Sequence, residues 1–357
     1  MTGEDPGASA PPRGKREPVL VLGGTGFIGQ ALVRRLLALG VPVRVLVRDP
    51  ARARRQLPPE VEQVPGDLVS GTGIGSALEG VRVAYYLVHS MGSAPGSFAE
   101  RDRVAAHNFV EAESRSGLER VIYLGGLGDE TGTASPHLAS RREVGGILRA
   151  GRAELASLRA GIVVGAGSSS FEMMVQLAEH LPVMICPRWI SSRCQPIALA
   201  DLVRYLVGCQ AVDLGDPGSL DAGGPEVLTY AEMLMRTGAA LGRRPALLEV
   251  PRFTPSLSSH WVAYITSVPA GVARPIIEGM LSDAVCADDR LRTLLPGPLT
   301  PFRTAVARAL EDRRALGRPP RLWGGHLLRP LEGRWWRFGP PPGSRAGADP
   351  GPRYDGA

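Results

Sequence analysis

The chain contains almost no lysine. Among its 357 residues and 41 basic side chains, Lys15 is the one lysine, and it stands in a polar leader ahead of the first apolar run. In many enzymes a lysine serves as a proton relay or as the amine that forms a Schiff base. Neither role is open to the part of this chain expected to fold, so any catalytic acid must be another side chain.

Cysteine is also scarce. The four cysteines share no C-x-x-C spacing and stand in ordinary apolar sequence, at Cys186, Cys194, Cys209 and Cys286. This distribution predicts buried apolar residues rather than metal ligands or disulfides, so no metal site is expected. A reducing cytoplasmic environment fits that usage.

Long hydrophobic runs are missing as well. The most apolar late stretch, Trp261 to Met280, is interrupted by Pro269, Arg274 and Pro275, which disfavours a membrane-spanning helix. The leader, residues 1–17, has no apolar core of the kind found in signal peptides. We therefore expect a cytoplasmic protein with a disordered leader and no membrane span.

The net charge of +6 is concentrated at one end. The segment from Arg318 onward contains seven arginines and three carboxylates, so it carries four of the six net positive charges. No basic stripe with interleaved aromatics runs along an expected helix or strand, so nucleic-acid binding is not expected. Residues 318–357 are interpreted as a basic, Pro/Gly-rich tail that is largely disordered, with Trp335 and Trp336 as the pair able to dock on the body.

A glycine-rich turn follows the first apolar run. Val19 to Leu22 has the pattern of a strand, glycines follow at positions 23, 26 and 29, and an amphipathic helix continues through Leu39. This spacing permits a tight turn, close approach of backbone to a pyrophosphate, and a helix N-terminus that faces the anion. A simple turn would also use glycine, but strand and helix on either side favour a dinucleotide site. The residues predicted to bind the cofactor here are Gly23, Thr25, Gly26, Phe27, Ile28 and Gly29.

Strands and helices alternate along the first half of the chain. Further strands are expected at Val43–Val47, Val61–Val64, Val83–Val88, Val121–Leu124 and Ile162–Val164, with a helix over Phe98–Ser116. Short links between them predict an α/β fold with a doubly wound parallel sheet of the Rossmann type. Ligands of such sheets bind beyond the carboxyl ends of the strands.

The second half is less regular. A capping box at Thr229 to Glu232 predicts a helix start after a Gly-Gly-Pro turn. We expect a Rossmann domain at residues 18–165 and a smaller C-terminal substrate lobe at residues 166–317, partly interleaved with the Rossmann sheet.

Two side chains are candidates for the adenosine end of the cofactor. Arg48 follows the second strand nineteen positions after Gly29, where a guanidinium would favour the 2′-phosphate of NADP(H) over NAD(H). Asp49 is adjacent, and the nearby arginines could form a solvated helix face instead. Asp67, with Leu68, ends the third strand beside the expected adenine, or else bonds its own turn.

The end of the fourth strand is the candidate nicotinamide side. Val88, His89 and Ser90 lie there, and His89 has a pKa range suited to proton transfer. A histidine at a strand end is more often structural, so both interpretations stay open.

Taken together, the motifs are similar to those of a known family. The chain resembles the atypical extended short-chain dehydrogenase/reductases, the branch with NmrA-like and complex I accessory-subunit-like proteins. The resemblance covers about residues 18 to 310 and depends on blocks in family order, at residues 23–29, 66–68, 86–92, Asn108, 158–165 and 223–230. Blocks at residues 168–173, 187–189 and 194–197 look like those of bacterial NAD(P)H-binding proteins in that branch.

The resemblance implies a serine after the fifth strand and a Tyr-x-x-x-Lys motif on the next helix. In this chain the corresponding positions hold Gly125-Gly126 and His137 with Arg141. The four-residue spacing places both side chains on one helix face. His137 could donate a proton, while Arg141 could hold a ribose or phosphate but cannot shuttle a proton. Alternatively, His137 is a plain first-turn residue after Pro136.

Two functions follow from these observations. The first is an NADP-dependent oxidoreductase acting on a hydrophobic carbonyl or quinone-like compound, with His137 or His89 as proton donor and a cleft lined by residues 165–174 and Trp261. The second is a non-catalytic NADP(H)-binding redox sensor or complex-assembly protein, because binding requires only the glycine turn and Arg48.

Overall fold

The computed structural model describes residues 17–89, 98–128, 135–212, 218–250, 266, 268 and 270–317. Several predicted features lie outside the described residues: residues 1–16 of the leader, Ser90, Trp261, the Trp335–Trp336 pair and the tail from residue 318.

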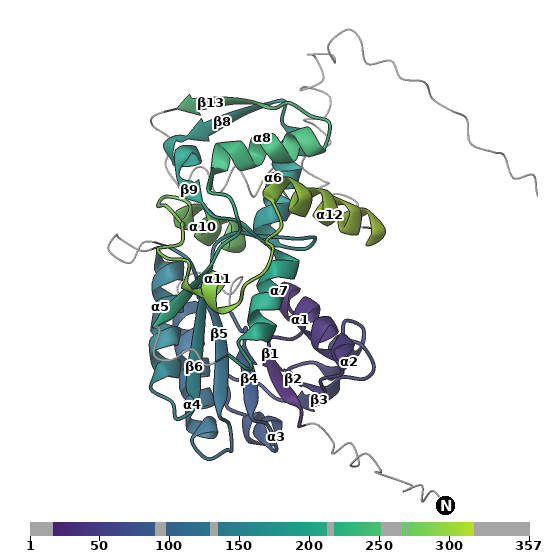
Figure 1. Cartoon of the computed structure of the whole chain (residues 1–357), viewed down its shortest axis with the longest axis vertical. Coiled ribbons are helices and arrows are strands. Elements are labelled where there is room, and N and C mark those ends of the chain that lie inside the picture. The colour runs from purple at the N-terminus through teal and green to yellow at the C-terminus, as the bar shows by residue number, and fades with distance from the viewer. Residues whose placement is uncertain are drawn as a thin grey trace, which may run out of the picture. The chain divides into compact units, whose positions relative to one another are not determined.

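A seven-stranded parallel sheet forms the centre of the fold, with strand order β11-β6-β5-β4-β1-β2-β3 (Figure 1). Every pairing within it is parallel. The strands are β1 (Val19–Leu22), β2 (Val43–Val47), β3 (Glu62–Pro65), β4 (Val83–Tyr86), β5 (Arg120–Gly126), β6 (Glu154–Ala160) and β11 (Ser219–Ala222). The predicted doubly wound Rossmann sheet is confirmed.

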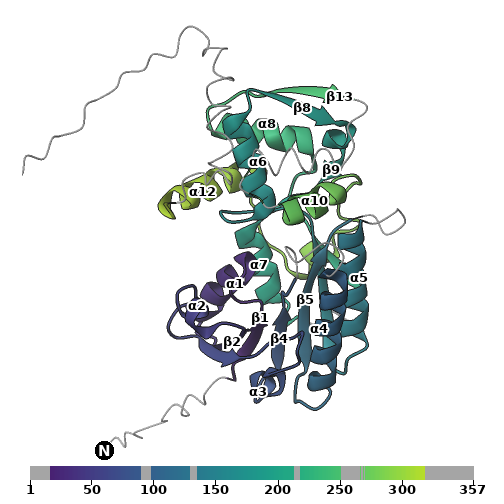
Figure 2. The ribbon, with the colours of Figure 1, turned by 180° about the vertical axis from the view of Figure 1, so that it is seen from behind.

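Helices cover both faces of this sheet. They are α1 (Phe27–Ala38), α2 (Pro50–Arg54), α3 (Ile74–Leu78), α4 (Phe98–Glu113), α5 (Pro136–Arg149) and α7 (Leu199–Gly208). Figures 1 and 2 show α1 beside α7 and α4 beside α5, as their packing contacts require.

Strand β1 shows why this layering forms. All four of its residues are buried, as expected of a parallel strand covered on both faces. Val19 and Val21 pack with the helices α1 and α7, whereas Leu20 and Leu22 pack with α3, α4 and α5. Successive side chains of a strand point to opposite faces, so this one strand contributes to two cores.

The prediction that Ile162–Val164 forms the sixth strand of the sheet is wrong. The sixth strand of the sheet is β6, and β7 (Val163–Val164) pairs with β10 (Ile197–Ala198) outside the sheet. Strand β6 was missed because its sequence carries Glu154, Ser157 and Arg159 among apolar residues. Arg159 is tolerated there because its guanidinium pairs with the buried Asp221 of β11 at 2.7 Å.

The second half of the described chain has an apolar core of its own. Its helices are α6 (Ser169–His180), α8 (Tyr230–Ala240), α10 (Ala270–Gly279), α11 (Arg290–Leu294) and α12 (Phe302–Ala315), with a short 3-10 helix η1 (Arg188–Ser191). The remaining strands are β8 (Val183–Pro187), β9 (Arg193–Cys194), β12 (Leu228–Thr229) and β13 (Ala246–Val250). The predicted capping box at Thr229 and Glu232 opens α8.

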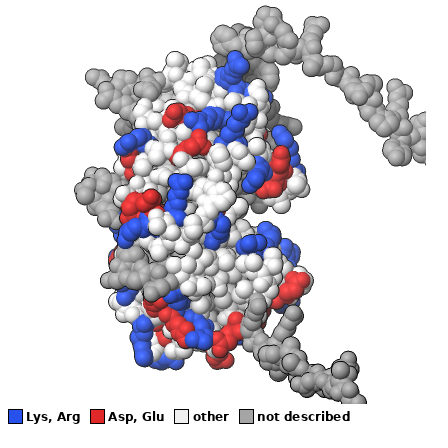
Figure 3. All heavy atoms as spheres, viewed as in Figure 1, with Lys and Arg blue, Asp and Glu red and all other residues white. Residues whose placement is uncertain are grey.

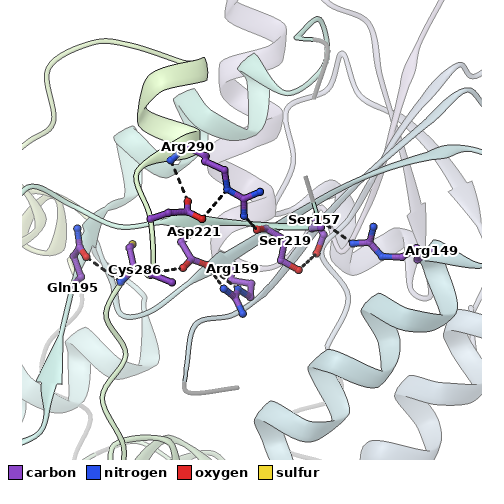
Figure 4. A network of polar contacts seen from close by, with 11 residues as sticks. Arg149, Ser157, Arg159, Gln195, Ser219, Asp221, Cys286 and Arg290 are labelled. Carbon is purple, nitrogen blue, oxygen red and sulfur yellow. Dashed lines mark hydrogen bonds and ion pairs between the residues drawn. The ribbon is translucent and has the colours of Figure 1, made fainter. Parts of the chain in front are cut away.

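A polar network ties this half to the sheet (Figure 4). Besides pairing with Arg159, Asp221 accepts a hydrogen bond from the Ala287 amide at 2.8 Å, and Gln195 accepts one from the Cys286 amide at 3.1 Å. Burial raises the pKa of the Cys286 thiol to about 12, which keeps it protonated and unreactive. The network therefore has the character of a structural tie.

Basic and acidic side chains are interspersed over the face seen in Figure 3. Within the described ranges, no helix combines the length and the apolar character that crossing a membrane requires.

Candidate cofactor and active site

The turn after β1 has the geometry of a phosphate cradle. Gly23 has a φ of +85°, which favours glycine, and its carbonyl accepts a hydrogen bond from the Gly26 amide at 2.9 Å. A Cβ atom on Gly29 would overlap the Gly23 carbonyl oxygen, so helix and turn touch through backbone. Helix α1 then starts at Phe27 without a side-chain cap, and its first amides are left for a ligand.

The other predicted residues of the turn hold it in place. Phe27 and Ile28 are partly buried against the first core cluster, and the Thr25 carbonyl accepts a hydrogen bond from Gln30 Nε2 at 2.9 Å. Gly26 is exposed. The residues present therefore fit a dinucleotide diphosphate, with the grip supplied by backbone amides.

Arg48 lies exposed between β2 and α2, and among the described residues its side chain has no hydrogen-bond or ion-pair partner. Its neighbour Asp49 caps α2 by accepting from the Arg52 amide at 2.9 Å. The carboxylate is thus committed to the helix, while the guanidinium is available to an anion.

The Asp67 side chain hydrogen-bonds within its own turn, which was the alternative to a contact with the adenine. Its Oδ1 accepts from the Val69 amide at 2.8 Å, two residues along. The Leu68 side chain is buried, while its carbonyl and that of Val69 accept from Asn108 Nδ2 of α4 at 2.8 and 3.0 Å. The carboxylate shapes the loop, and Asn108 fastens the loop to helix α4.

The glycine turn and the end of β4 are in contact. A Cβ on Gly23 would lie 2.9 Å from the Leu87 carbonyl oxygen and 3.3 Å from the Val88 nitrogen. This contact places Val88 and His89 directly beside the cradle.

His89 lies in a cluster of titratable side chains. Its Nδ1 is 3.0 Å from Oδ2 of Asp102 on α4, and its ring centroid is 4.7 Å from that of His137 on α5. The side chains of His89 and Asp102 are 13% and 3% exposed. The structure therefore brings together two of the predicted acids and one carboxylate that the sequence analysis missed.

Burial sets the protonation of this pair. It lowers the pKa of His89, with Asp102 acting in the opposite direction, and lowers the pKa of His137 to about 3, with the neighbouring His89 and Arg141 adding to the effect. Both imidazoles are therefore neutral near pH 7.

The Arg141 guanidinium is hydrogen-bonded to backbone carbonyl groups. Its Nη1 donates to the Val88 carbonyl at 3.2 Å, its Nη2 donates to the Leu124 carbonyl, and the guanidinium lies 5.3 Å from the centre of the Tyr123 ring. Arg141 thus joins the carboxyl ends of β4 and β5. Tyr123 returns a hydrogen bond to the Arg141 carbonyl at 2.8 Å.

Gly125 and Gly126 are the last two residues of β5, and a Cβ on Gly125 would lie 3.3 Å from Tyr123 Cε1. A Cβ on Gly126 would lie 2.6 Å from Leu138 Cδ2. Any hydroxyl needed at this rim must come from elsewhere.

Asp102 had a readable sequence signal. It lies on the buried stripe of α4 with Ala105, Ala106 and Phe109. A carboxylate in an apolar helical stripe needs a partner, and the partner is His89.

Comparison with known proteins supports a nicotinamide dinucleotide as the cofactor. A family of NAD(P)H-binding domains matches residues 23–162. A ceramide reductase of Caulobacter vibrioides is 29% identical over 243 residues, covering 66% of this chain and 74% of that protein. A 3-beta-hydroxysteroid dehydrogenase of Mycolicibacterium neoaurum is 32% identical over 114 residues, covering 29% of this chain and 31% of its own length.

Solved structures agree on the fold. UDP-glucose 4-epimerase of Thermotoga maritima superposes with a TM-score of 0.65 at 13% identity, over 84% of this chain and all of that chain. UDP-N-acetylglucosamine 4-epimerase of Bacillus cereus gives 0.64 at 16% identity, over 86% of this chain and 99% of that one. Residues 23–162 therefore match an NAD(P)H-binding domain, and the chain shares its fold with these two epimerases.

Proposed function

We propose that this protein is an NADP(H)-dependent oxidoreductase that reduces a hydrophobic carbonyl or quinone-like compound. One observation carries the proposal: Gly23 packs against Leu87 and Val88, so the phosphate cradle adjoins the His89 and His137 pair. When bound, the reduced cofactor supplies a hydride. The protein has to orient it and furnish a proton, and His137 or His89 is the donor.

The second half supports a hydrophobic substrate. Helix α10 packs against α5, which carries His137, and against α6. A cavity of about 20 Å³, which is too small for a substrate, lies between α6, α8 and α10 and shows the apolar lining of this half, formed by Met173, Met174, Leu177, Tyr230, Leu234, Ile277 and Met280. Methionines adapt to irregular apolar shapes. The relatives named ceramide reductase and 3-beta-hydroxysteroid dehydrogenase agree with an apolar substrate class.

The preference for NADP(H) depends on Arg48. The Arg48 guanidinium is free, and the neighbouring Asp49 carboxylate is engaged in capping α2. This arrangement favours a 2′-phosphate over a 2′-hydroxyl. Placement in the NmrA-like branch and residence in the cytoplasm belong to the same proposal, as do the boundaries at residues 165 and 317.

The experiment is NADPH consumption by purified protein with a panel of long-chain ketones, 3-ketosteroids and quinones. We expect turnover of at least one compound, and the rate of NADPH consumption should be about 10²-fold lower, or lower still, in His137→Gln. His107→Gln, on the exposed side of α4, is the matched control and should keep full activity.

Tight NADPH binding with no turnover across the panel would contradict the proposal. It would instead favour a non-catalytic NADP(H) sensor or assembly protein, which the replacement of serine, tyrosine and lysine by Gly125, His137 and Arg141 also suits.

A further inference from the structure

Two buried ring nitrogens in the histidine pair lack a partner. Among the described residues, neither His89 Nε2 nor His137 Nδ1 has a hydrogen bond, and both atoms are shielded from solvent. A buried nitrogen without a partner costs free energy. The two orphaned atoms belong to rings whose centroids lie 4.7 Å apart with planes inclined at 49°.

Asp102 fixes the state of the first ring. An ionised carboxylate can only accept, so the 3.0 Å contact with Oδ2 makes His89 Nδ1 the donor. The proton on Nδ1 is thereby held, and Nε2 becomes the nitrogen that gains or loses a proton. Asp102 is itself 3% exposed, so its contact with His89 is shielded from solvent.

We propose that Asp102, His89 and His137 form a proton relay that replaces the missing tyrosine and lysine. The inference rests on the proposed carbonyl reduction and names its proton path. His137 is the catalytic acid that meets the substrate through Nε2, His89 reloads it through the two orphaned nitrogens, and Asp102 is a positioning residue.

The relay starts from a form that holds one proton more than the state in which both imidazoles are neutral. The loaded form holds protons on both nitrogens of His89 and on His137 Nε2, with Asp102 ionised. A bound reduced nicotinamide would supply a hydride to the substrate carbonyl carbon, and the carbonyl oxygen takes the Nε2 proton of His137 as the C=O π bond breaks. In the same step His137 Nδ1 takes the Nε2 proton of His89, so that no imidazolate anion forms; the two nitrogens have no hydrogen bond in this structure and have to approach each other for this transfer. The products are an alcohol, the oxidised cofactor and two neutral imidazoles, and solvent later returns one proton.

The charges around the pair determine its pH dependence. Asp102 of α4 favours the loaded form, whereas Arg141 of α5 and burial oppose it; Tyr86 of β4 and Tyr123 of β5 stay neutral because burial raises their pKa. The loaded form is scarce near pH 7 because the pKa values of both histidines are lowered. Reduction should therefore become faster as pH falls towards the range in which the pair gains its proton.

The first test measures kcat and KM against pH for wild type, Asp102→Asn, His89→Gln and the control His107→Gln. Asparagine keeps an acceptor oxygen but no charge. We expect Asp102→Asn and His89→Gln to lower kcat about 10²-fold. In Asp102→Asn the alkaline limb of the profile, where activity falls as the pair loses its proton, should move to lower pH. KM for NADPH should be unchanged, and His107→Gln should match wild type in every parameter.

A wild-type pH profile and kcat in both variants, with loss only in His137→Gln, would overturn the relay and leave His137 acting alone. An equal loss at every pH would also overturn it, because a structural defect lowers kcat without moving the alkaline limb.

The second test needs no turnover, so it separates the relay from the proposed function. Calorimetry of NADPH binding in two buffers of different ionisation enthalpy counts the protons taken up. A polyanion beside the pair raises its pKa, so uptake approaching about one proton is expected below pH 6. The uptake should vanish in His89→Gln and persist in His107→Gln. Equal uptake in His89→Gln and wild type would reject the relay even if no substrate is found.

Discussion

The cofactor side and the proton side of this rim are built differently. The glycine turn at residues 23–29 is held through backbone: Gly29 lies against the Gly23 carbonyl, and α1 starts without a side-chain cap. The proton side works through side chains that meet from three segments, Asp102, His89 and His137. Backbone function depends on glycine spacing, whereas a side-chain set can be exchanged while the rim is kept. On the proposed function, the chain therefore keeps its cofactor-binding turn while its catalytic side chains differ.

The largest expected effect is on the cradle. Gly29→Ala places a Cβ in the Gly23 carbonyl and should weaken NADPH binding more than about 100-fold, since backbone at both ends must shift. Gly75→Ala in α3 is the matched control, because no atom lies within 4 Å of its Cβ position. Isothermal titration measures both. Similar affinities in the two variants would mean that the cradle does not hold the diphosphate.

The second effect concerns specificity. Arg48→Ala should weaken NADPH binding about 10- to 100-fold, the loss of a charge-assisted hydrogen bond or two, and leave NADH unchanged. Arg35→Ala, exposed on α1, is the control. Fluorescence titration with both cofactors checks the outcome, and parallel losses for NADPH and NADH would remove Arg48 from 2′-phosphate recognition.

The third effect tests Arg141 as a strap between strands. Arg141→Met leaves the Val88 and Leu124 carbonyls without this donor and should lower the free energy of unfolding by about 1 to 3 kcal/mol. Chemical denaturation measures the loss. Removing this charge should also raise the pKa of both histidines. An unchanged stability would show that the guanidinium is free to serve a ligand.

The smallest effect is the acid sensitivity of the histidine pair. The unfolded His137 has a pKa near 6.5 and the folded one about 3, so its contribution is fully present above pH 6.5 and is lost as pH falls towards 3. Between pH 7 and pH 5, wild type should lose about 1 to 2 kcal/mol more stability than His137→Gln. Denaturation at the two pH values measures this, and parallel losses would mean that His137 is solvated.

The sequence predicted the backbone features better than the side-chain contacts. The glycine turn and the parallel sheet follow from local spacing and apolar runs, and both are present. Strand β6 was missed because Arg159 is balanced by Asp221, a residue 62 positions away. The partnership of His89 with Asp102 depends on where α4 returns to the sheet, which no local pattern states. Arg141 looked available for a ribose because its partners are backbone carbonyls, which carry no sequence signature.

The seventh strand has a consequence for the order of synthesis. Strand β11 joins the sheet from residues 219–222, and α7 brings Leu202 and Leu206 into the same core as Val19 and Val21. A ribosome that has released only residues up to 165 has made the whole cradle but neither of these coverings. The nascent domain would then expose one apolar face and one strand edge until some sixty further residues emerge, so it should depend on a chaperone during that interval.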